Sequence, residues 1–499
     1  MASGWLSARG RALSGAWLGV LTYVVTPALV DEAVGDGLAW EMRLRALPAR
    51  FTAYFVLGLC LFSALPYDGV IGEVTGGVKA ALAAAGWQPP STTALSRARG
   101  RLGEEPLRSL FRRLCSALSP GMAPWSHACG LLAVAWDGTC LAVADTPANA
   151  AAFGRAGSTA GPAGPQLRAV TLIACGTRAL LDAAIGPLTG KGAGERALAA
   201  RLLGSLRPGM LLLADRNFWS FPLWNAAAAT GAHLLWRVKE GKHVKAVREL
   251  PDGSLLARVE DPRAVMDRWH KNSKRARTGN LPPDQSPLPG CITVRVIDYL
   301  LAVTADDGST RTQPYRLFTT LLDWRAFPAP ALAAAYSRRW AIESGYRECK
   351  AYLRGPRMLR GKTPALARQE AWALLAVYQA IRTLIARAAA RDGTDPGRIS
   401  FTTALHAIRR TTTTPRRSLT TTLDATEAEM LASLAPERPG RIYPRAVTKK
   451  TSPYPARRTS TSPISQHASH ATTITRRPTP NSTPANQPKH PLTAATQPP

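Results

Sequence analysis

Between residues 131 and 238 the chain is built from short apolar runs separated by turns, and this pattern restricts its fold more than any other feature. The runs read LLAVAWD (131–137), CLAVAD (140–145), AVTLIAC (169–175), GMLLLAD (209–215) and AHLLWRV (232–238). Runs of this length between turn residues are typical of buried strands. A helical stretch, 195–206, lies between the third and fourth runs. We therefore predict a mixed α/β sheet.

Residues 239 to about 318 break this alternation and predict a β-rich insertion. The stretches 292–303 (ITVRVIDYLLAV) and 314–321 (PYRLFTTL) have the composition of strands. Ahead of them, residues 268–280 (RWHKNSKRARTGN) form a basic segment without one acid, which we interpret as a loop. Two helices are expected after the insertion, at 329–353 and 369–390, because both stretches are rich in strong helix formers.

The charge of the chain indicates a polyanionic partner. With 63 Lys and Arg against 33 Asp and Glu, its 499 residues carry a formal net charge of +30. Such a balance favours nucleic acid or an acidic membrane over a small neutral substrate. The length predicts two or three domains. The seven cysteines are scattered and never spaced as C-x-x-C, which argues against a disulfide framework or a cysteine zinc site and fits a reducing compartment.

Two apolar stretches, 12–30 and 51–67, have features of a signal sequence or a membrane anchor. The first contains Gly, Ser, Thr and Pro, and the second has only seventeen residues, nearer the length of a buried helix. We therefore interpret both as buried helices and expect no membrane association. A membrane anchor at 12–30 is the alternative.

Basic residues gather near both ends of the chain. Arg97, Arg99 and Arg101 lie in a helical pattern that begins near Ser91, and they suit either a helix-turn-helix-like DNA module or a solvated basic face. After Glu437 the chain has ten Lys or Arg, no acid, and mostly Pro, Ser and Thr. We expect this tail to be disordered and cationic.

Acids at two strand ends are the first candidates for chemistry. Asp137 closes the run 131–137 and Asp215 closes the run 209–215. Sites in open sheets are assembled at the carboxyl ends of strands, so these two carboxylates can converge. Taken singly, each is better explained as the cap of a turn, which is the commoner role of Asp after an apolar run.

Polar residues on the 329–353 helix add to these acids. Tyr336, Arg339, Glu343 and Lys350 fall within an arc of about 60° at roughly 100° per residue, so all four project from one stripe. A solvated face with an i,i+4 ion pair gives the same pattern. A solvated face does not explain why these four helix residues occur together with two strand-end acids in a basic chain.

The spacing of these four residues, Tyr-x2-Arg-x3-Glu-x6-Lys, resembles the signature of the insertion sequence 4 family of DDE transposases. Segments 137–155 and 214–218 are similar to the family's first-Asp and second-Asp segments, and the stretches 47–70 and 91–111 to its N-terminal domain. The similarity spans about residues 28 to 458. Each motif alone is modestly specific, but their order and combination are highly specific.

The resemblance implies an α/β fold with a ribonuclease-H-like catalytic core, a β-rich insertion, a helical DNA-binding domain before the core and a disordered basic tail. It implies Asp137, Asp215 and Glu343 as catalytic acids and as ligands of two Mg²⁺ ions, which Mn²⁺ can replace. Hard Mg²⁺ prefers oxygen ligands. Two ions about 3.5–4 Å apart activate the attacking oxygen and stabilise the leaving oxygen of a phosphodiester. The separation of 128 positions between Asp215 and Glu343 agrees with an insertion.

The resemblance also implies DNA as the partner, both the terminal inverted repeats of the element and the target. It implies a homodimer in the synaptic complex and a cytoplasmic, nucleoid-associated protein. Tyr336, Arg339 and Lys350 become DNA contacts beside the acids. The basic segments supply further candidate DNA contacts: Arg97, Arg99, Arg101, Lys271, Lys274 and Arg275. A catalytically inactive DNA-binding protein of transposon descent is the alternative function.

The family's implied route to a double-strand break is a hairpin, which requires a terminal base to leave the stack. Extruding a base costs a few kcal/mol, and an aromatic platform returns roughly 1–3 kcal/mol by stacking. Tyr315, at the start of the predicted strand 314–321, is the candidate platform and Trp269 the alternative. Packing is the commoner role of an aromatic residue at a strand start.

The domain boundaries follow from these patterns. We expect an N-terminal DNA-binding domain at 1–125, the core at 126–238 and 319–400 with the insertion 239–318 between its parts, a C-terminal region at 401–450 and the tail at 451–499.

Overall fold

The computed structural model describes most of the chain. The described residues are 13, 16–36, 47–116, 124–155, 164–190, 192–242, 244–278, 290–304, 310–413, 418–435 and 469–474.

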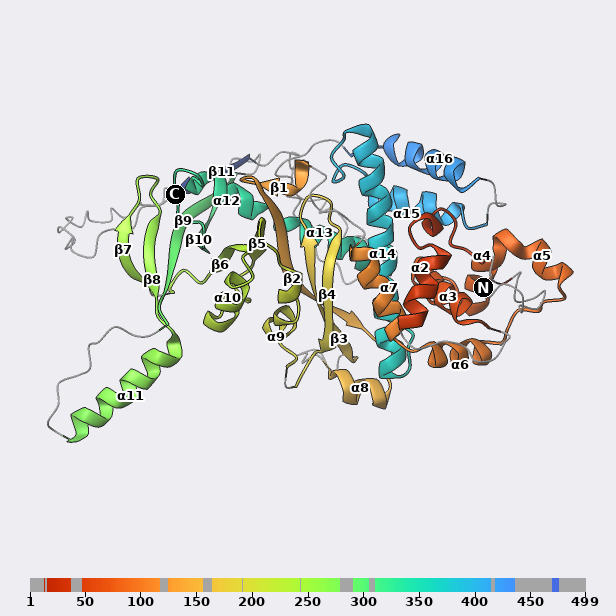
Figure 1. Cartoon of the computed structure of the whole chain (residues 1–499), viewed down its shortest axis with the longest axis horizontal. Helices are drawn as coiled ribbons and strands as arrows, with labels where there is room; N and C mark the ends of the chain where they lie inside the picture. Colours follow the sequence, from red (N-terminus) through yellow and green to blue (C-terminus); the bar gives the residue numbers. More distant parts are fainter. Residues whose placement is uncertain are drawn as a thin grey trace, which may run out of the picture.

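One large mixed sheet organises the molecule (Figure 1). Its described strands are β1 (His127–Ala128), β2 (Leu131–Ala142), β3 (Gln166–Ala174), β4 (Leu180–Pro187), β5 (Met210–Ala214), β6 (His233–Val238), β7 (Lys245–Glu249), β8 (Leu255–Val259), β9 (Ile292–Thr304), β10 (Thr310–Thr319) and β11 (Ser469–Ile474). The strand order is β4-β3-β2-β5-β6-β10-β9-β8-β7, with β1 beside β2 and β11 beside β9. The pairs β2–β5 and β5–β6 are parallel and the other pairs are antiparallel. The predicted mixed α/β sheet is confirmed.

Two details of the predicted sheet are wrong. The runs 131–137 and 140–145 are not two strands, because β2 continues through Asp137 and Gly138, which pair with Thr171 and Val170 of β3. The strand β4 was not predicted. It pairs with β3 along an edge that the helical part of the molecule covers.

Helices cover both faces of the sheet. Alternate side chains of β2 point to opposite faces. Trp136 packs on the face covered by α9 (Glu195–Ala200) and α10 (Phe221–Ala228), whereas Ala135 packs on the face covered by α12 (Ala329–Ser337) and α13 (Trp340–Arg347). Asp137 follows on the second face. The sheet thus directs this acid toward α13.

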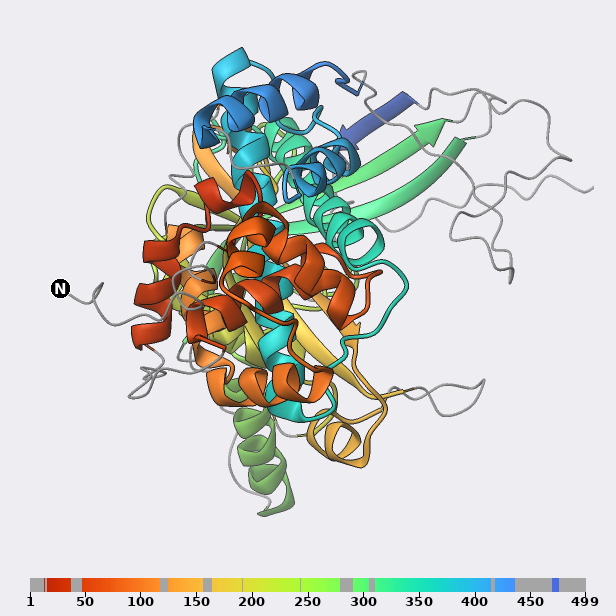
Figure 2. The same ribbon diagram turned by 90° about the vertical axis from the view of Figure 1, so that its right-hand side faces the viewer.

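A helical body packs against the β3–β4 edge of the sheet. It comprises η1 (Leu21–Tyr23), α2 (Pro27–Asp36), α3 (Ala49–Leu61), α4 (Tyr67–Thr75), η2 (Gly76–Val78), α5 (Lys79–Ala84), α6 (Thr92–Leu102), α7 (Glu105–Ser116), α14 (Pro364–Asp392), α15 (Phe401–Arg410) and α16 (Leu419–Leu431). One apolar core joins N-terminal helices to α14, α15 and α16. Figure 2 shows the N-terminal helices gathered around α14. Residues from the two ends of the chain therefore share one core.

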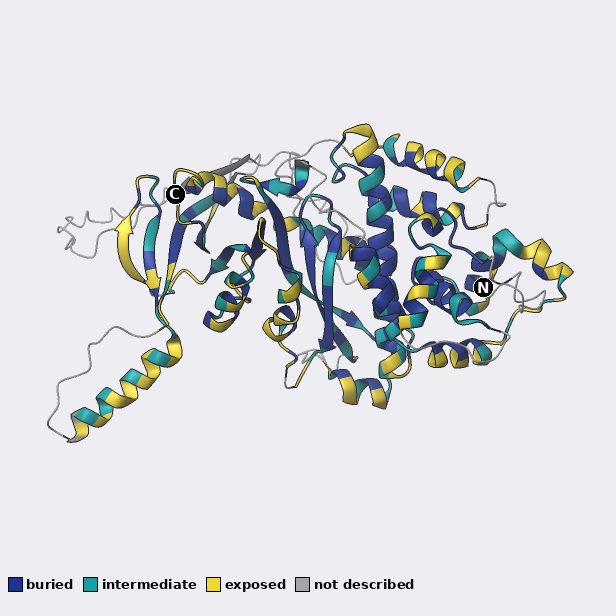
Figure 3. Ribbon diagram, in the orientation of Figure 1, coloured by how far each residue is buried: buried dark blue, intermediate teal, exposed yellow. Residues whose placement is uncertain are grey.

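The second apolar N-terminal stretch contains a buried helix, as predicted, whereas the described residues of the first are only partly buried. Eleven consecutive residues of α3, Phe51–Leu61, are buried. Described residues within 12–30 form η1 and the start of α2 instead of one continuous helix. Within the described residues only α14 is long and apolar enough to cross a membrane. Of its most apolar 18-residue stretch, 78% is buried inside the molecule (Figure 3).

The insertion consists of β7, β8, α11 (Pro262–Thr278), β9 and β10. The predicted basic loop 268–280 is wrong as far as Thr278, because these residues belong to the helix α11, which projects from the end of the sheet (Figures 1 and 3). Residues 279 and 280 lie outside the described residues.

One segment of the predicted disordered tail forms a strand. Residues 469–474 make β11, which pairs antiparallel with 299–304 of β9 (Figure 2). The rest of 451–499 lies outside the described residues. The remaining short elements are η4 (Pro124–Ser126), α8 (Pro147–Phe153), η5 (Leu203–Ser205) and a π-helical turn, η6 (Glu348–Leu353).

Candidate active site

Two neighbouring parallel strands bring Asp137 and Asp215 to one edge of the sheet. β2 pairs with β5 from Leu132 to Ala135, so Asp137 lies just beyond the paired segment. Asp215 directly follows the last residue of β5, and its Oδ1 accepts a hydrogen bond of 2.8 Å from the backbone N–H of Asn217. Only Asp215 lies at a strand end, but the two acids are near enough for the charge of Asp215 to raise the pKa of Asp137.

The third acid stands on a helix that is broken just before it. The predicted continuous helix 329–353 is wrong, because the chain forms α12, α13 and the π-helical turn η6 in succession. Between α12 and α13, the N–H groups of Ala341 and Ile342 bond to carbonyls only three residues back, which tightens the turn. Glu343 lies in the first turn of α13.

The guanidinium group of Arg339 links two of the acids. Its Nη2 donates to Oε1 of Glu343 at 3.1 Å, and its Nη1 lies 3.8 Å from Oδ2 of Asp137. The Arg339 side chain is 11% exposed, and its Nε has no hydrogen-bond partner within the described residues. Arg339, Glu343 and Asp137 therefore form a partly buried charged cluster.

Burial raises the pKa of Asp137 from its usual 3.8 to about 6. The N–H of Gly138 and the charge of Arg339 oppose this shift, while the carboxylates of Asp215 and Glu195 add to it. A carboxyl group whose pKa is raised by folding stabilises the fold below its unfolded pKa and loses that contribution as pH rises through the folded value.

We therefore expect Asp137→Asn to stabilise the metal-free protein more at neutral than at acidic pH. The gap between 3.8 and about 6 corresponds to about 3 kcal/mol at pH 7.5 and about 1 kcal/mol at pH 4.5. Thermal unfolding in a chelator at the two pH values measures this difference. Asp145→Asn is the control, because the exposed Asp145 has its pKa lowered by Arg155 and should show no such gain. An equal effect of Asp137→Asn at both pH values would contradict the raised pKa.

Tyr336 braces the end of β5. Its hydroxyl donates to the carbonyl of Ala214 at 3.3 Å, and the residue is 4% exposed. The prediction that Tyr336 contacts DNA is corrected, because its ring is buried and its hydroxyl is already bonded to the strand. It fixes the main chain immediately before Asp215.

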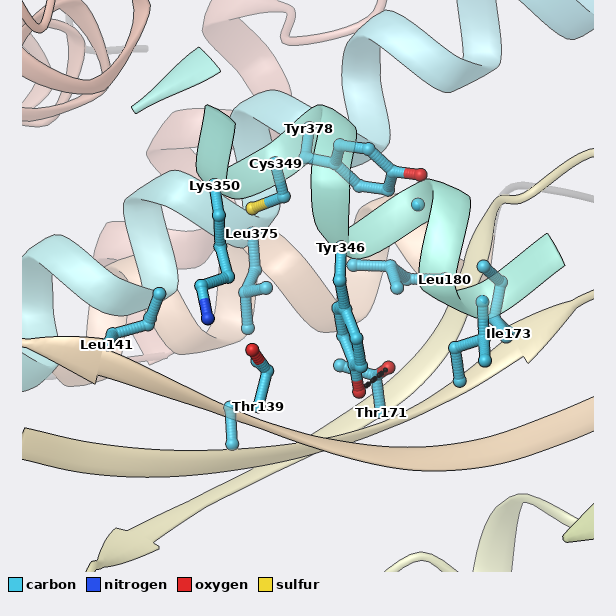
Figure 4. Close-up of a pocket in the computed structure, with 13 residues that line it drawn as sticks. Thr139, Leu141, Thr171, Ile173, Leu180, Tyr346, Cys349, Lys350, Leu375 and Tyr378 are labelled. Atoms are coloured by element: carbon cyan, nitrogen blue, oxygen red, sulfur yellow. Dashed lines mark hydrogen bonds between the residues drawn. The ribbon is translucent and has the colours of Figure 1, made fainter. Parts of the chain in front are cut away.

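Lys350 points toward the face of β2 that carries Asp137, at Thr139, which lies two residues further along the strand. It lines a cavity of about 20 Å³ with Thr139, Leu141 and Tyr346, and its ammonium group is directed toward Thr139 (Figure 4). Side chains two residues apart on a strand share a face and lie about 7 Å apart. Lys350 therefore lies beside the residue that follows Asp137 on this face of β2.

Two residues beside the acids were missed by the sequence interpretation. Tyr346 donates to the backbone carbonyl of Asp137 and bonds to Thr171 Oγ1 at 2.9 Å, which fixes the strand at the acid. Glu195 lies against Gly138 so closely that a Cβ at that position would be 2.4 Å from its Oε1. The signal available in the sequence was Gly138 itself, since a glycine within a strand often marks a close approach.

The sequence comparisons agree with this geometry. A family model described as the transposase DDE domain matches residues 129–380, and one described as the insertion element 4 transposase N-terminal domain matches residues 16–112.

The chain belongs to the insertion element 4 family of DDE transposases.

The resemblance found in the sequence is therefore confirmed. The transposase InsG for insertion sequence element IS4 of Escherichia coli (strain K12) is 28% identical over 440 residues, which are 86% of this chain and 91% of that protein. A cryo-EM structure of the piggyBac transposase synaptic complex with hairpin DNA aligns over 85% of this chain and 86% of that chain, with 9% identity and a TM-score of 0.39, a likeness too distant to support an argument. This transposase is an enzyme that cleaves DNA and transfers strands.

DDE transposase domains generally depend on divalent metal ions. The acids of this transposase have the donor chemistry for such ions, since carboxylate oxygens are preferred by Mg²⁺ and Mn²⁺. Within the part of the chain that the structure describes, however, no three His, Cys, Asp or Glu side chains are grouped closely enough to hold an ion. Arg339 instead lies against two of the three acids.

The three arginines of α6 divide into two kinds. Arg97 and Arg101 are exposed, as a DNA contact requires. The prediction for Arg99 is corrected, because it is 1% exposed and donates to Gln369 at 3.1 Å and Glu370 at 3.2 Å on α14. Arg99 joins α6 to α14 in the interior of the transposase and is not available to phosphate.

Neutralising Arg97 and Arg101 together should flatten the salt dependence of DNA binding. Each lost phosphate contact lowers the slope of log affinity against log salt by about 0.9 on duplex DNA, so the double Gln variant should lose up to about 1.8. Titrations at several salt concentrations measure the slope. Arg99→Gln is the control and should lower the unfolding temperature while leaving the slope unchanged. An unaltered slope in the double variant would show that this face is merely solvated.

Lys271, Lys274 and Arg275 lie on α11, where Lys271 and Lys274 are exposed and Arg275 is half-buried. On the same helix Trp269 is 60% exposed. The helix therefore presents both cationic and aromatic side chains beyond the end of the sheet.

Tyr315 does not form the open platform that was predicted. It lies in the middle of β10 and is 7% exposed. Tyr299 on β9 stacks on it with ring centroids 5.1 Å apart, and the guanidinium carbon of Arg237 on β6 lies 3.9 Å from its ring centroid. Because β9 and β6 flank β10, these neighbours cover the ring from both sides. Tyr315 is a packing residue.

Proposed function

We propose that this transposase cuts DNA at the terminal inverted repeats of its own insertion element and joins the freed ends to target DNA. The observation that carries the proposal is the charged cluster in which Arg339 lies against Asp137 and Glu343. Asp215 interacts electrostatically with Asp137, and Lys350 lies beside Thr139, two residues further along β2. Acids bordered by cations suit a phosphodiester substrate, because the cations offset the repulsion between its negative charge and the carboxylates.

The strand topology supports a ribonuclease-H-like core. The strands β4, β3 and β2 are antiparallel neighbours, and β5 and β6 continue the sheet in parallel with β2. We place this core at 126–238 and 319–400, with the DNA-binding domain at 1–125, the insertion at 239–318, the C-terminal region at 401–450 and the tail at 451–499. In this arrangement the insertion separates the second acid from the third.

Asp137, Asp215 and Glu343 would hold two Mg²⁺ ions, and Mn²⁺ can replace them. When bound, two such ions activate the attacking oxygen and stabilise the leaving oxygen. Arg339 binds a phosphate through two parallel hydrogen bonds, and Lys350 supplies a point charge to the DNA backbone. Tyr336 and Tyr346 bond to the main-chain carbonyls of Ala214 and Asp137, so the backbone at both aspartates is held in place before DNA arrives.

More distant basic residues bind the DNA on either side of the cut. Arg97 and Arg101 lie on the helical body, and Lys271, Lys274 and Arg275 on α11. Two copies of the chain pair in the synaptic complex, in the cytoplasm at the nucleoid and without a membrane. Cleavage of the second strand passes through a hairpin. The exposed Trp269 is the remaining candidate for the aromatic side chain on which the extruded base stacks.

A nicking assay tests this function. The purified full chain is incubated with a duplex that carries a terminal repeat identified in the DNA flanking its gene, in Mg²⁺, in Mn²⁺ or in a chelator. We expect a nick at the element end only with a divalent ion, followed by a hairpin product on a denaturing gel. Binding without cleavage in either metal would instead support a catalytically inactive DNA-binding protein.

A further inference from the structure

The contacts of Arg339 occupy oxygens that a catalytic metal would need. Its guanidinium donates to Oε1 of Glu343 at 3.1 Å and lies 3.8 Å from Oδ2 of Asp137. Glu343 is 41% exposed and Asp137 21% exposed on their side chains, so a small ion can reach both carboxylates from solvent. Arg339 and a divalent cation therefore compete for the same pair of acids.

Displacing Arg339 without giving it a new partner is unfavourable. Its side chain is only 11% exposed, and its Nε has no hydrogen-bond partner within the described residues. A guanidinium group that loses its carboxylates in such a place is a largely buried, uncompensated charge. A phosphate group relieves this cost, because it accepts two parallel hydrogen bonds from the guanidinium fork.

We propose that Arg339 makes metal binding at Asp137 and Glu343 depend on DNA. In the DNA-free protein its guanidinium holds both carboxylates, and a DNA phosphate draws it away and opens them to the ion. This inference rests on the proposed function. It agrees with the observation that, within the described residues, no three acids are grouped closely enough for a metal.

The two ligands are then thermodynamically coupled. If DNA raises the affinity for the metal by some factor, the metal must raise the affinity for DNA by the same factor, and such factors are typically about 5- to 150-fold. The cutting centre is complete only when substrate is present. Part of this coupling comes from the phosphate oxygens, which are themselves metal ligands, and the remainder passes through Arg339.

Titrations of Mn²⁺ against the full chain measure the part of this coupling that passes through Arg339. The signal of free Mn²⁺ in electron paramagnetic resonance is titrated with and without a terminal-repeat duplex whose 3′ ends are dideoxy, with the binding of Mn²⁺ to the duplex alone subtracted. We expect Arg339→Gln to raise the Mn²⁺ affinity of the DNA-free protein at least fivefold and to reduce the gain produced by DNA. An unchanged DNA-free affinity would overturn the proposal.

Two further variants distinguish the contact of Arg339 with the two carboxylates from the general effect of a nearby positive charge on Mn²⁺ affinity. Arg338→Gln removes a neighbouring charge whose guanidinium bonds to the carbonyls of Trp125 and His127 and not to an acid, so it should leave the Mn²⁺ affinity nearly unchanged. Arg339→Lys keeps the charge but cannot bridge both carboxylates, so it should raise the affinity of the DNA-free protein. A gain from Arg338→Gln equal to that of Arg339→Gln, or wild-type behaviour of Arg339→Lys, would also overturn the proposal.

The outcomes also distinguish this proposal from the proposed function. If the wild-type chain nicks its terminal repeat with metal but Arg339→Gln leaves the DNA-free Mn²⁺ affinity unchanged, only the role of Arg339 is wrong. If no metal supports nicking, the proposed function fails, and the Mn²⁺ titrations still decide whether Arg339 competes for the acids.

Discussion

Replacing Asp137 or Asp215 by Asn, or Glu343 by Gln, should each lower the rate of DNA cleavage by about 10³-fold or more, a loss of about 4 kcal/mol of transition-state stabilisation. Each amide keeps the size of the side chain but removes the charge that the metal requires. DNA binding in a chelator should stay within about twofold of wild type. Single-turnover nicking rates and mobility shifts measure the two effects.

Asp145→Asn is the matched control for these variants. Asp145 lies just after the end of β2, is exposed, and is paired with Arg155 instead of with Arg339. Its replacement should leave cleavage within about twofold of wild type. Substantial metal-dependent cleavage by any of the three acid variants would remove that residue from the catalytic centre.

The positions of Asp137 and Asp215 could be predicted because they depend on local pattern. Each follows an apolar run that is buried on both faces, and the two runs are parallel neighbours, so the residues just after the paired segment of β2 and the end of β5 lie near one another. The continuity of β2 could not be predicted, because Asp-Gly-Thr after an apolar run has the composition of a turn. Pairing with β3 along the whole segment overrides that local preference.

The buried charges could not be predicted, because their partners are far away in the sequence. Arg99 has the same local setting as Arg97 and Arg101, yet its carboxylate partner Glu370 is 271 residues away. The break between α12 and α13 was missed for a related reason. Strong helix formers run through it, and the contacts of Arg339 with Asp137, 202 positions earlier in the chain, are made at this turn.

The residue that links α13, which carries Glu343, to the helical body is another such buried charge. Glu348 begins the π-helical turn that links Glu343 on α13 to Lys350, and its side chain is 7% exposed. Its carboxylate accepts from Arg178 at 2.8 Å and from the Tyr378 hydroxyl at 3.2 Å, and it pairs with the fully buried Arg382 on α14. This network ties the segment that carries Glu343, the proposed catalytic acid, to the helical body.

We therefore expect Glu348→Gln to destabilise the transposase by about 3–5 kcal/mol, because it leaves the buried Arg382 without its counterion. Thermal and urea unfolding measure the loss. Adding Arg382→Met should restore part of the stability, since the uncompensated charge is then removed as well. Glu343→Gln is the contrasting variant. Glu343 is 41% exposed, so its replacement should abolish cleavage without a comparable loss of stability. Unchanged stability of Glu348→Gln would show that the network does not anchor α13, and no recovery in the double variant would show that Arg382 is not the source of the cost.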